Sequence, residues 1–197
     1  MPKSTFTNLP PERQQQIREL LLTIFYEKPV SQVKVSEIVA ALKMSRGIFY
    51  KYFEDLNDAY DYVIHYYAGK VHGEIIEYVT HHEGDFFKGM EEFLLLAAKL
   101  KKDDLRYREI VLLTQNSYLF SYRSEVSHGM EMWQEILAKN HFNIQSEEES
   151  ISFLYFSMKL VIDSLTDMLA NHWSEAELIA DFRFKSRWLT AGLRTDR

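Results

Sequence analysis

Ten consecutive residues, Met44 to Phe53, carry the side chains whose types and spacing best suit a chemical task. Ser45 can cap a helix, because its hydroxyl oxygen can accept a hydrogen bond from a backbone N–H of the first turn. Arg46, Tyr50 and Lys51 follow within two turns and supply guanidinium, phenol and ammonium donors. Such donors suit phosphate oxygens, and a planar guanidinium also suits the edge of a guanine. The segment therefore predicts a helix that packs on one face and contacts nucleic acid with the other.

Eight residues of this region are predicted to contact DNA. They are Lys43, Ser45, Arg46, Gly47, Ile48, Tyr50, Lys51 and Tyr52. The glycine allows the backbone to approach DNA closely, the isoleucine could touch a thymine methyl, and the tyrosine and lysine donors would hold phosphates. Phe49 and Phe53 lie four residues apart and are assigned to the core side. The alternative is an ordinary capped helix with exposed aromatic residues at a hinge.

Motifs of catalysis are not found in the sequence. It contains no Gly-x-Ser-x-Gly, no glycine-rich phosphate loop and no His-Glu-x-x-His. Asp61, His65 and His72 could share one face of a helix, but we interpret these histidines as exposed or hydrogen-bonded. The sequence thus predicts no enzyme, no metal site and no cofactor.

Three short helices are expected to position the DNA-contacting residues. Apolar spacing predicts the first from Pro10 or Pro11 to Tyr26, and Pro29 follows its end. The second is expected over Val35–Leu42 and the third over Arg46–Tyr52. Helices of this length, with a tight turn between the last two, form a helix-turn-helix unit whose last helix enters the major groove.

The charge is unevenly distributed along the chain. Residues 1–53 hold eight Lys and Arg against four Asp and Glu, a balance of +4. The whole chain has a net charge of −6, so the remaining residues carry −10. A basic N-terminal part on an acidic body is compatible with one surface that faces nucleic acid.

Residues 10–60 resemble the DNA-binding head of the TetR (tetracycline-repressor) family of bacterial transcriptional regulators. The resemblance rests on the first-helix pattern Ile17, Leu21 and Phe25, on Val35–Ala40, and above all on Ser45–Phe53. That last run is similar to the family signature Ser-x-Gly-Thr-hydrophobic-Tyr-x-Tyr/His-Phe. It departs from the family pattern at Lys43, where the family has a turn glycine, at Ile48, where it often has threonine, and at Leu56, where it commonly has lysine.

The resemblance implies an all-α fold of two domains. Residues 1–54 would form the helix-turn-helix head, and residues 55–197 a helical domain for effector binding and dimerisation. It further implies a dimeric regulator, most often a repressor, that binds a near-palindromic DNA operator and is released by a small molecule. Two alternatives remain open: a regulator that works through a protein partner without an effector, and a helical binding domain or enzyme that has lost DNA binding.

A long helix, from about Leu56 to Val79, is expected to follow the head. About 24 residues at 1.5 Å each span roughly 36 Å, so this helix could link the head mechanically to the body, or simply be a core helix. Further helices are expected over about Phe86–Lys102, Leu105–Phe120 and Ser124–Lys139.

In the family, the region formed by these helices encloses a ligand cavity, and aromatic walls suit a small apolar or aromatic effector. The candidate lining residues are Tyr62, Tyr66, Phe93, Tyr107, Tyr118 and Trp133. The alternative is that these side chains only fill a core.

Two capping boxes, Ser146–Glu149 and Ser174–Glu177, predict the starts of the last two helices. Apolar residues at alternating three- and four-residue spacing form a seam that a partner helix could fill. The predicted dimer-interface residues are Ile151, Leu154, Met158, Val161, Leu165, Phe182 and Leu189. We expect a four-helix homodimer interface, with a purely intrachain core as the alternative.

The composition excludes several classes of protein. The 197 residues include no cysteine, so disulfides and thiolate metal sites are excluded. No run approaches the roughly 18 apolar residues of a membrane span, and the N-terminus has no signal-peptide apolar core. The expectation is a cytoplasmic protein without a membrane partner.

Overall fold

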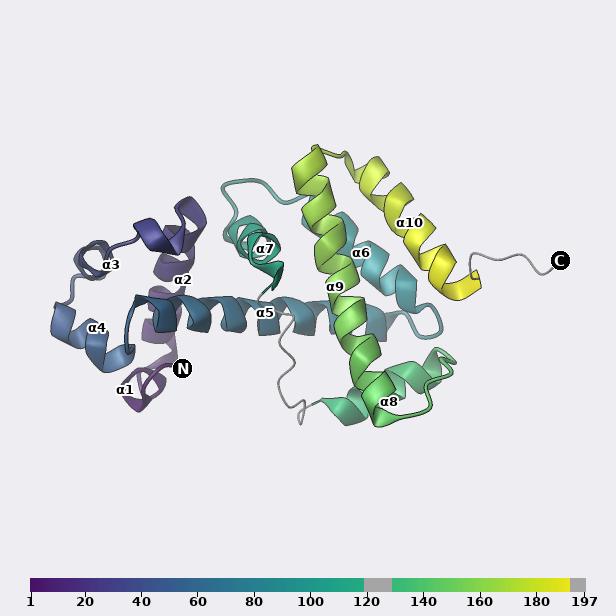
Figure 1. The fold of residues 1–197 in the computed structure, drawn as a ribbon, viewed down its shortest axis with the longest axis horizontal. Helices are drawn as coiled ribbons and strands as arrows, with labels where there is room; N and C mark the ends of the chain where they lie inside the picture. Colours follow the sequence, from purple (N-terminus) through teal and green to yellow (C-terminus); the bar gives the residue numbers. More distant parts are fainter. Residues whose placement is uncertain (119–128, 192–197) are drawn as a thin grey trace. The chain divides into compact units, whose positions relative to one another are not determined.

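Helices are the regular elements of the structure, a computed structural model that describes residues 1–118 and 129–191 (Figure 1). They are α1 (Ser4–Thr7), α2 (Pro11–Glu27), the 3₁₀ turn η1 (Val30–Gln32), α3 (Val35–Ala41), α4 (Arg46–Tyr52), α5 (Leu56–His81), α6 (Phe86–Ala98), α7 (Leu105–Gln115), α8 (Met130–Lys139), α9 (Glu147–Asn171) and α10 (Glu175–Ala191). The all-α fold predicted from the sequence is confirmed. Of the helix expected over residues 124–139, residues 124–128 lie outside the described ranges. No helix within those ranges is long and apolar enough to cross a membrane.

Side-chain caps explain why several helices begin where the sequence predicts. The Ser146 hydroxyl accepts a hydrogen bond from the Glu149 N–H at 3.1 Å, which starts α9. At α10 the capping box is reciprocal, because Ser174 Oγ accepts from Glu177 N at 3.3 Å and the Glu177 carboxylate accepts from Ser174 N at 2.8 Å. Glu149 instead accepts from the backbone N–H of Gln145 at 2.7 Å.

Contacts divide the chain into two compact units, and the border falls inside helices. The first unit is Met1–Lys70 with Lys101–Leu113, and the second is Val71–Leu100 with Thr114–Arg197. The border therefore cuts α5 after Lys70 and α7 after Leu113. The functional border placed after residue 54 stays a prediction.

The first unit has a core of fully buried apolar side chains. They include Phe6, Ile17, Leu21, Leu22, Ile38, Phe49 and Phe53. Two polar links add the N-terminal part of α7 to this unit. Lys70 Nζ donates to both carboxylate oxygens of the buried Glu109, at 2.8 and 2.9 Å, and Arg108 Nη1 donates to Thr23 Oγ1 at 3.1 Å. Helix α7 is thereby joined to the middle of the long helix α5 through Lys70 and to α2 through Thr23.

The second unit is built around α6, α9 and α10 and an aromatic cluster. Phe86 lies between Trp133 and Phe142, with ring centroids 5.9 and 5.1 Å away, and Phe153 contacts all three. At Gly89 the backbones of α5 and α6 meet directly, since an added Cβ would lie 2.6 Å from the carbonyl oxygen of Tyr78. Aromatic packing and one close helix crossing thus define this unit.

A buried carboxylate links α6 to α10, and its removal should be measurable. Glu91 accepts hydrogen bonds from Arg183 Nε and Nη2 at 2.8 and 2.7 Å, and Arg183 holds the pKa of this carboxyl below its usual value. The lowered pKa stabilises the fold above pH 4.5, and this stabilisation is lost as the pH falls through the folded-state pKa. Glu91→Gln should therefore cost about 1 kcal/mol of unfolding free energy at neutral pH, because Arg183 itself is exposed.

Urea unfolding at pH 7 and at acidic pH would measure this effect. The difference between wild type and Glu91→Gln should shrink in acid, where the wild-type carboxyl is itself protonated. Glu131→Gln, at an exposed position of α8, should change stability by less than about 0.5 kcal/mol. An equal loss at both pH values would show that the ion pair is not the cause.

Candidate nucleic-acid interface

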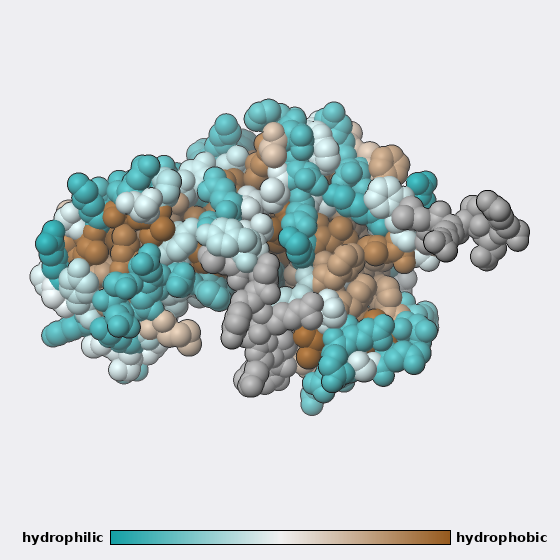
Figure 2. Space-filling view, in the orientation of Figure 1, coloured by the Kyte–Doolittle hydropathy of each residue, from teal (hydrophilic) through white to brown (hydrophobic). Residues whose placement is uncertain are grey.

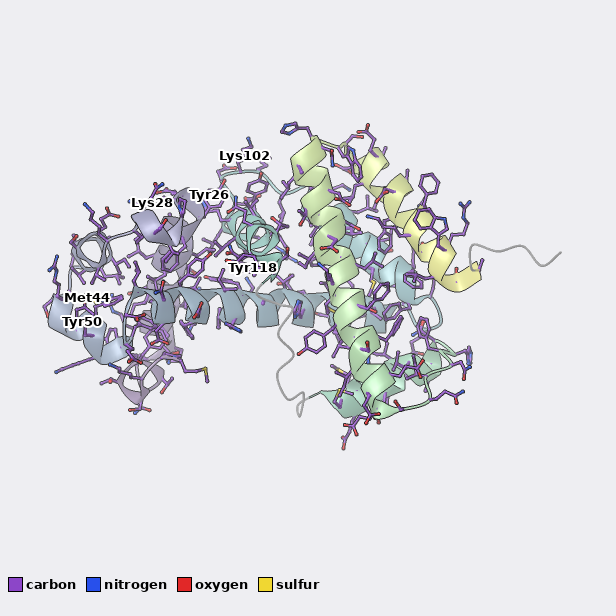
Figure 3. The ribbon with its side chains drawn as sticks, viewed as in Figure 1. Tyr26, Lys28, Met44, Tyr50, Lys102 and Tyr118 are labelled. Carbon is purple, nitrogen blue, oxygen red and sulfur yellow. The ribbon has the colours of Figure 1, made fainter. Side chains whose placement is uncertain are left out.

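The eight residues predicted to contact DNA lie on α4 and the turn before it. Ser45 caps α4, with its hydroxyl accepting from Ile48 N at 3.3 Å. Seven of the eight are exposed; in Figure 3, Tyr50 appears on α4 and Met44 on the preceding turn. Tyr52 is the exception, because its half-buried ring packs edge-on against Phe6 at 5.8 Å. Phe49 and Phe53 are fully buried, so α4 has one packed face and one free face.

The turn between α3 and α4 is strained at Lys43. Its φ is +51°, in the left-handed region that glycine adopts at little cost and other residues do not. This is the position where the resemblance identified a missing turn glycine. We expect Lys43→Gly to raise the unfolding free energy by about 1 kcal/mol, measured by urea unfolding. Lys43→Ala removes the same charge but keeps the strain, so an equal gain in both variants would contradict this explanation.

The N-terminal segment, residues 3–6, holds the C-terminal end of α4. Lys3 N donates to Tyr52 O at 2.8 Å, Lys3 Nζ to Tyr50 O at 2.9 Å, and Thr5 Oγ1 to Lys51 O at 2.6 Å. These carbonyls belong to the last turn, where no intrahelical N–H is available to them. The segment therefore positions α4, a role that was not predicted from the sequence. The residue that could have indicated this role is Phe6, an isolated aromatic residue before Pro10–Pro11.

Cations on the free face of α4 are not neutralised by the protein. Lys43, Arg46 and Lys51 are exposed, and none forms an ion pair with a side chain in the part of the chain that the structure describes. By contrast, Lys28 in the same unit binds Glu37 at 2.5 Å and lowers the pKa of that carboxyl. Three unpaired cations on one short surface favour a polyanionic partner.

The six aromatic residues predicted to line an effector pocket are divided between the units. Tyr62, Tyr66 and Tyr107 belong to the first, and Phe93, Tyr118 and Trp133 belong to the second. In the first unit, Tyr62 packs against Phe6 at 5.1 Å, and the Arg18 guanidinium lies 4.2 Å from the ring centroid of Tyr66. These two tyrosines thus pack around the N-terminal helices.

The remaining four do not share one environment either. Tyr107 lies 6.5 Å from Tyr26 in the first unit. In the second, Phe93 and Trp133 are buried, whereas Tyr118, just after α7, is 68% exposed (Figure 3). Their joint role in effector binding stays a prediction.

A cavity of about 340 Å³ lies in the second unit, where α8 ends and α9 begins. Its lining residues are Gln134, Leu137, Ala138, Phe142, Ile144, Gln145, Ser146, Glu147 and Ser150. We call it the α8–α9 cavity. None of the six predicted pocket residues lines it, so it is a separate feature from the predicted effector pocket.

Most of the predicted dimer seam is buried within one chain. Met158, Val161, Leu165 and Phe182 are at most 5% exposed, so they pack in the core of their own unit. Ile151 and Leu154 are half-buried, and Leu189 is exposed. Three- and four-residue spacing identifies a packed face of a helix, but it does not identify which chain covers that face. Residues predicted from this spacing to contact a second chain can therefore be buried within their own.

A different set of apolar residues is available on the outer surface of α9 and α10. Phe156, Phe184, Trp188 and Leu189 are each 42–49% exposed. Figure 2 shows a hydrophobic area over α9. Exposed large apolar side chains of this kind mark candidate contact surfaces.

Among known proteins, one family matches the C-terminal part of the chain. The sequence profile of the tetracyclin repressor-like C-terminal domain matches residues 85–193. A solved structure that aligns with the chain is that of a TetR family transcriptional regulator from Chloroflexus aurantiacus J-10-FL, at 18% sequence identity and a TM-score of 0.45, covering 95% of this chain and 90% of that one. No curated protein matches the sequence.

The match over residues 85–193 spans more than half of the chain. With the helix-turn-helix head described above, it defines the class of protein as a helical transcriptional regulator. The chain belongs to the TetR family.

Proposed function

We propose that the protein binds a near-palindromic DNA operator as a homodimer in the cytoplasm, acts as a repressor, and is released by a small apolar or aromatic effector. The observation that carries DNA binding is the free face of α4, with three exposed cations that no described side chain neutralises. Arg46 would read a base edge or hold a phosphate, and Tyr50 and Lys51 would hold phosphates. Membership of the TetR family supports the same function.

A homodimer is proposed through the outer surface of α9 and α10. Phe156, Phe184 and Trp188 are the large apolar side chains that a second copy would cover. Two-fold symmetry would then present two copies of α4 to two half-sites of one operator. Sedimentation of the wild type against a Phe184→Glu, Trp188→Glu double variant would test this surface, and an unchanged dimer would contradict it.

The DNA-binding proposal is tested with a double variant, Tyr50→Ala with Lys51→Ala. The operator would first be selected from random duplexes with the wild type, and binding then followed by fluorescence anisotropy at several salt concentrations. We expect the double variant to lose at least about tenfold in affinity, and Lys51→Ala alone to reduce the salt slope by about 1.

The control is Lys159→Ala, which removes an exposed lysine of α9 that is paired with Asp163 and should not change DNA affinity. If the wild type selects no duplex, DNA binding itself is refuted. If the double variant binds as tightly as the wild type, the assignment of contacts to α4 is wrong.

A further inference from the structure

One buried hydroxyl on α9 lacks a hydrogen-bond partner. Ser150 is 3% exposed, and its Oγ atom is buried without a donor or acceptor in reach among the described residues. Serine hydroxyls in helices often donate to the carbonyl four residues earlier, as Ser164 does to Leu160 O at 2.8 Å in the same helix. Ser150 does not, although the residue is one of those that line the α8–α9 cavity. Such a buried, unpartnered group is unfavourable for folding.

The walls of the cavity combine four apolar residues with five polar or charged ones. Leu137, Phe142 and Ile144 supply apolar contact, and the cavity has a volume of about 340 Å³. Small-molecule sites in proteins have volumes that begin at about 300 Å³. The space is therefore suited to a ligand about the size of one substituted ring.

The charge of the lining selects the class of ligand. Among the residues that the structure describes, no lysine, arginine or histidine lines the cavity, whereas Glu147 does. Glu147 forms no ion pair or side-chain hydrogen bond with a described residue, whereas the Glu149 carboxylate accepts a hydrogen bond from Gln145 N. The first turn of α9 also holds Glu147, Glu148 and Glu149 together, which offsets the positive end of the helix dipole and disfavours an anion.

We propose that the α8–α9 cavity binds a small organic cation with an apolar body. The ammonium group would lie between the Glu147 carboxylate and the Phe142 ring, and the apolar body would contact Leu137 and Ile144. This gives the proposed effector a site and a charge, but binding at the cavity does not depend on DNA binding and is tested without DNA.

The structure supplies its own reporter for occupancy. The indole N–H of the buried Trp133 donates to Ser150 O at 3.0 Å, so a ligand against Ser150 should shift its NMR signal. The chain has three tryptophans, and Trp173 and Trp188 do not line the cavity. Their indole signals serve as internal references for non-specific binding.

Three probes of nearly the same shape test the charge preference on the full chain: 2-phenylethylammonium, 2-phenylethanol and phenylacetate. We expect 2-phenylethylammonium to shift the Trp133 indole signal saturably. Phenylethanol should bind about tenfold more weakly, and phenylacetate should not bind. A saturable Trp133 shift with phenylacetate, or no saturable shift with the ammonium probe, would overturn the proposal.

Variants assign the binding to named groups. Glu147→Gln should weaken the ammonium probe about tenfold and leave phenylethanol unchanged. Ser150→Ala should change neither affinity and should not lower the melting temperature, since its buried hydroxyl has no partner to lose and contacts neither probe. Ser164→Ala, a buried hydroxyl of α9 away from the cavity, should change neither affinity. Unchanged ammonium binding by Glu147→Gln would refute the proposed site, whatever the outcome of the DNA experiments.

Discussion

Replacing Phe6 with alanine is expected to lower the unfolding free energy by about 3 kcal/mol, as for other fully buried phenylalanines. Its ring is completely buried and contacts Tyr52, Phe53 and Tyr62 at 5.8, 5.1 and 5.1 Å. The substitution should also lower the affinity for DNA. Phe6 anchors the segment whose Lys3 and Thr5 bind the last carbonyls of α4, so its loss should leave that helix less well positioned. Urea unfolding measures the first effect, and DNA anisotropy measures the second.

Two neighbouring variants separate packing from positioning. Thr7→Ala changes an exposed residue of the same helix and should cost less than about 0.5 kcal/mol. Thr5→Val keeps the shape but removes the hydroxyl that donates to Lys51 O at 2.6 Å, so it should weaken DNA binding more than it weakens the fold. If Phe6→Ala were as stable as Thr7→Ala, the segment would not be part of the core.

Gly89→Ala is the second change with a large expected effect. A Cβ at this position would lie 2.6 Å from Tyr78 O and from Val79 Cα, which are backbone atoms that cannot rotate away. Helices α5 and α6 would have to move apart at their crossing, at a cost of about 2–3 kcal/mol or more. Thermal and urea unfolding should both report this loss.

Gly73→Ala provides the matched control on α5. No atom of the described residues lies within 4 Å of a Cβ at that exposed position, so alanine should gain up to about 1 kcal/mol through its higher helix propensity. Opposite signs for the two glycines would identify the helix crossing as the cause. A loss of similar size in both would contradict that explanation.

Local signals predicted the helices well because they are encoded by neighbouring residues. Ser45 and Ser174 bind the N–H groups that their capping positions require, and Pro29 follows the end of α2 as expected. The segment Arg46–Tyr52 forms one helix with the predicted bounds. Caps and apolar periodicity act over a few residues, so the sequence displays them directly.

Features that depend on distant residues were not predictable in this way. Helix α1 has four residues, too few for a periodic pattern, and Phe6 reaches its partners about 50 residues away. In the sequence, nothing distinguishes Gly89 from other glycines in amphipathic helices. Its contact with the backbone of Tyr78 is visible only in the structure. The apolar seam at Met158 and Leu165 could equally face its own chain or another, because periodicity does not identify the partner.

The discontinuous make-up of the first unit has a consequence for synthesis on the ribosome. Met1–Lys70 are made first. Lys101–Leu113 belong to the same unit, but they are made only after Val71–Leu100, which belong to the second unit. At about 5–20 residues per second, the chain waits several seconds for the residues that pair Glu109 with Lys70. During that interval the N-terminal helices would lack this support, so nascent chains stalled before residue 101 should be more readily digested by protease than chains stalled well beyond residue 113.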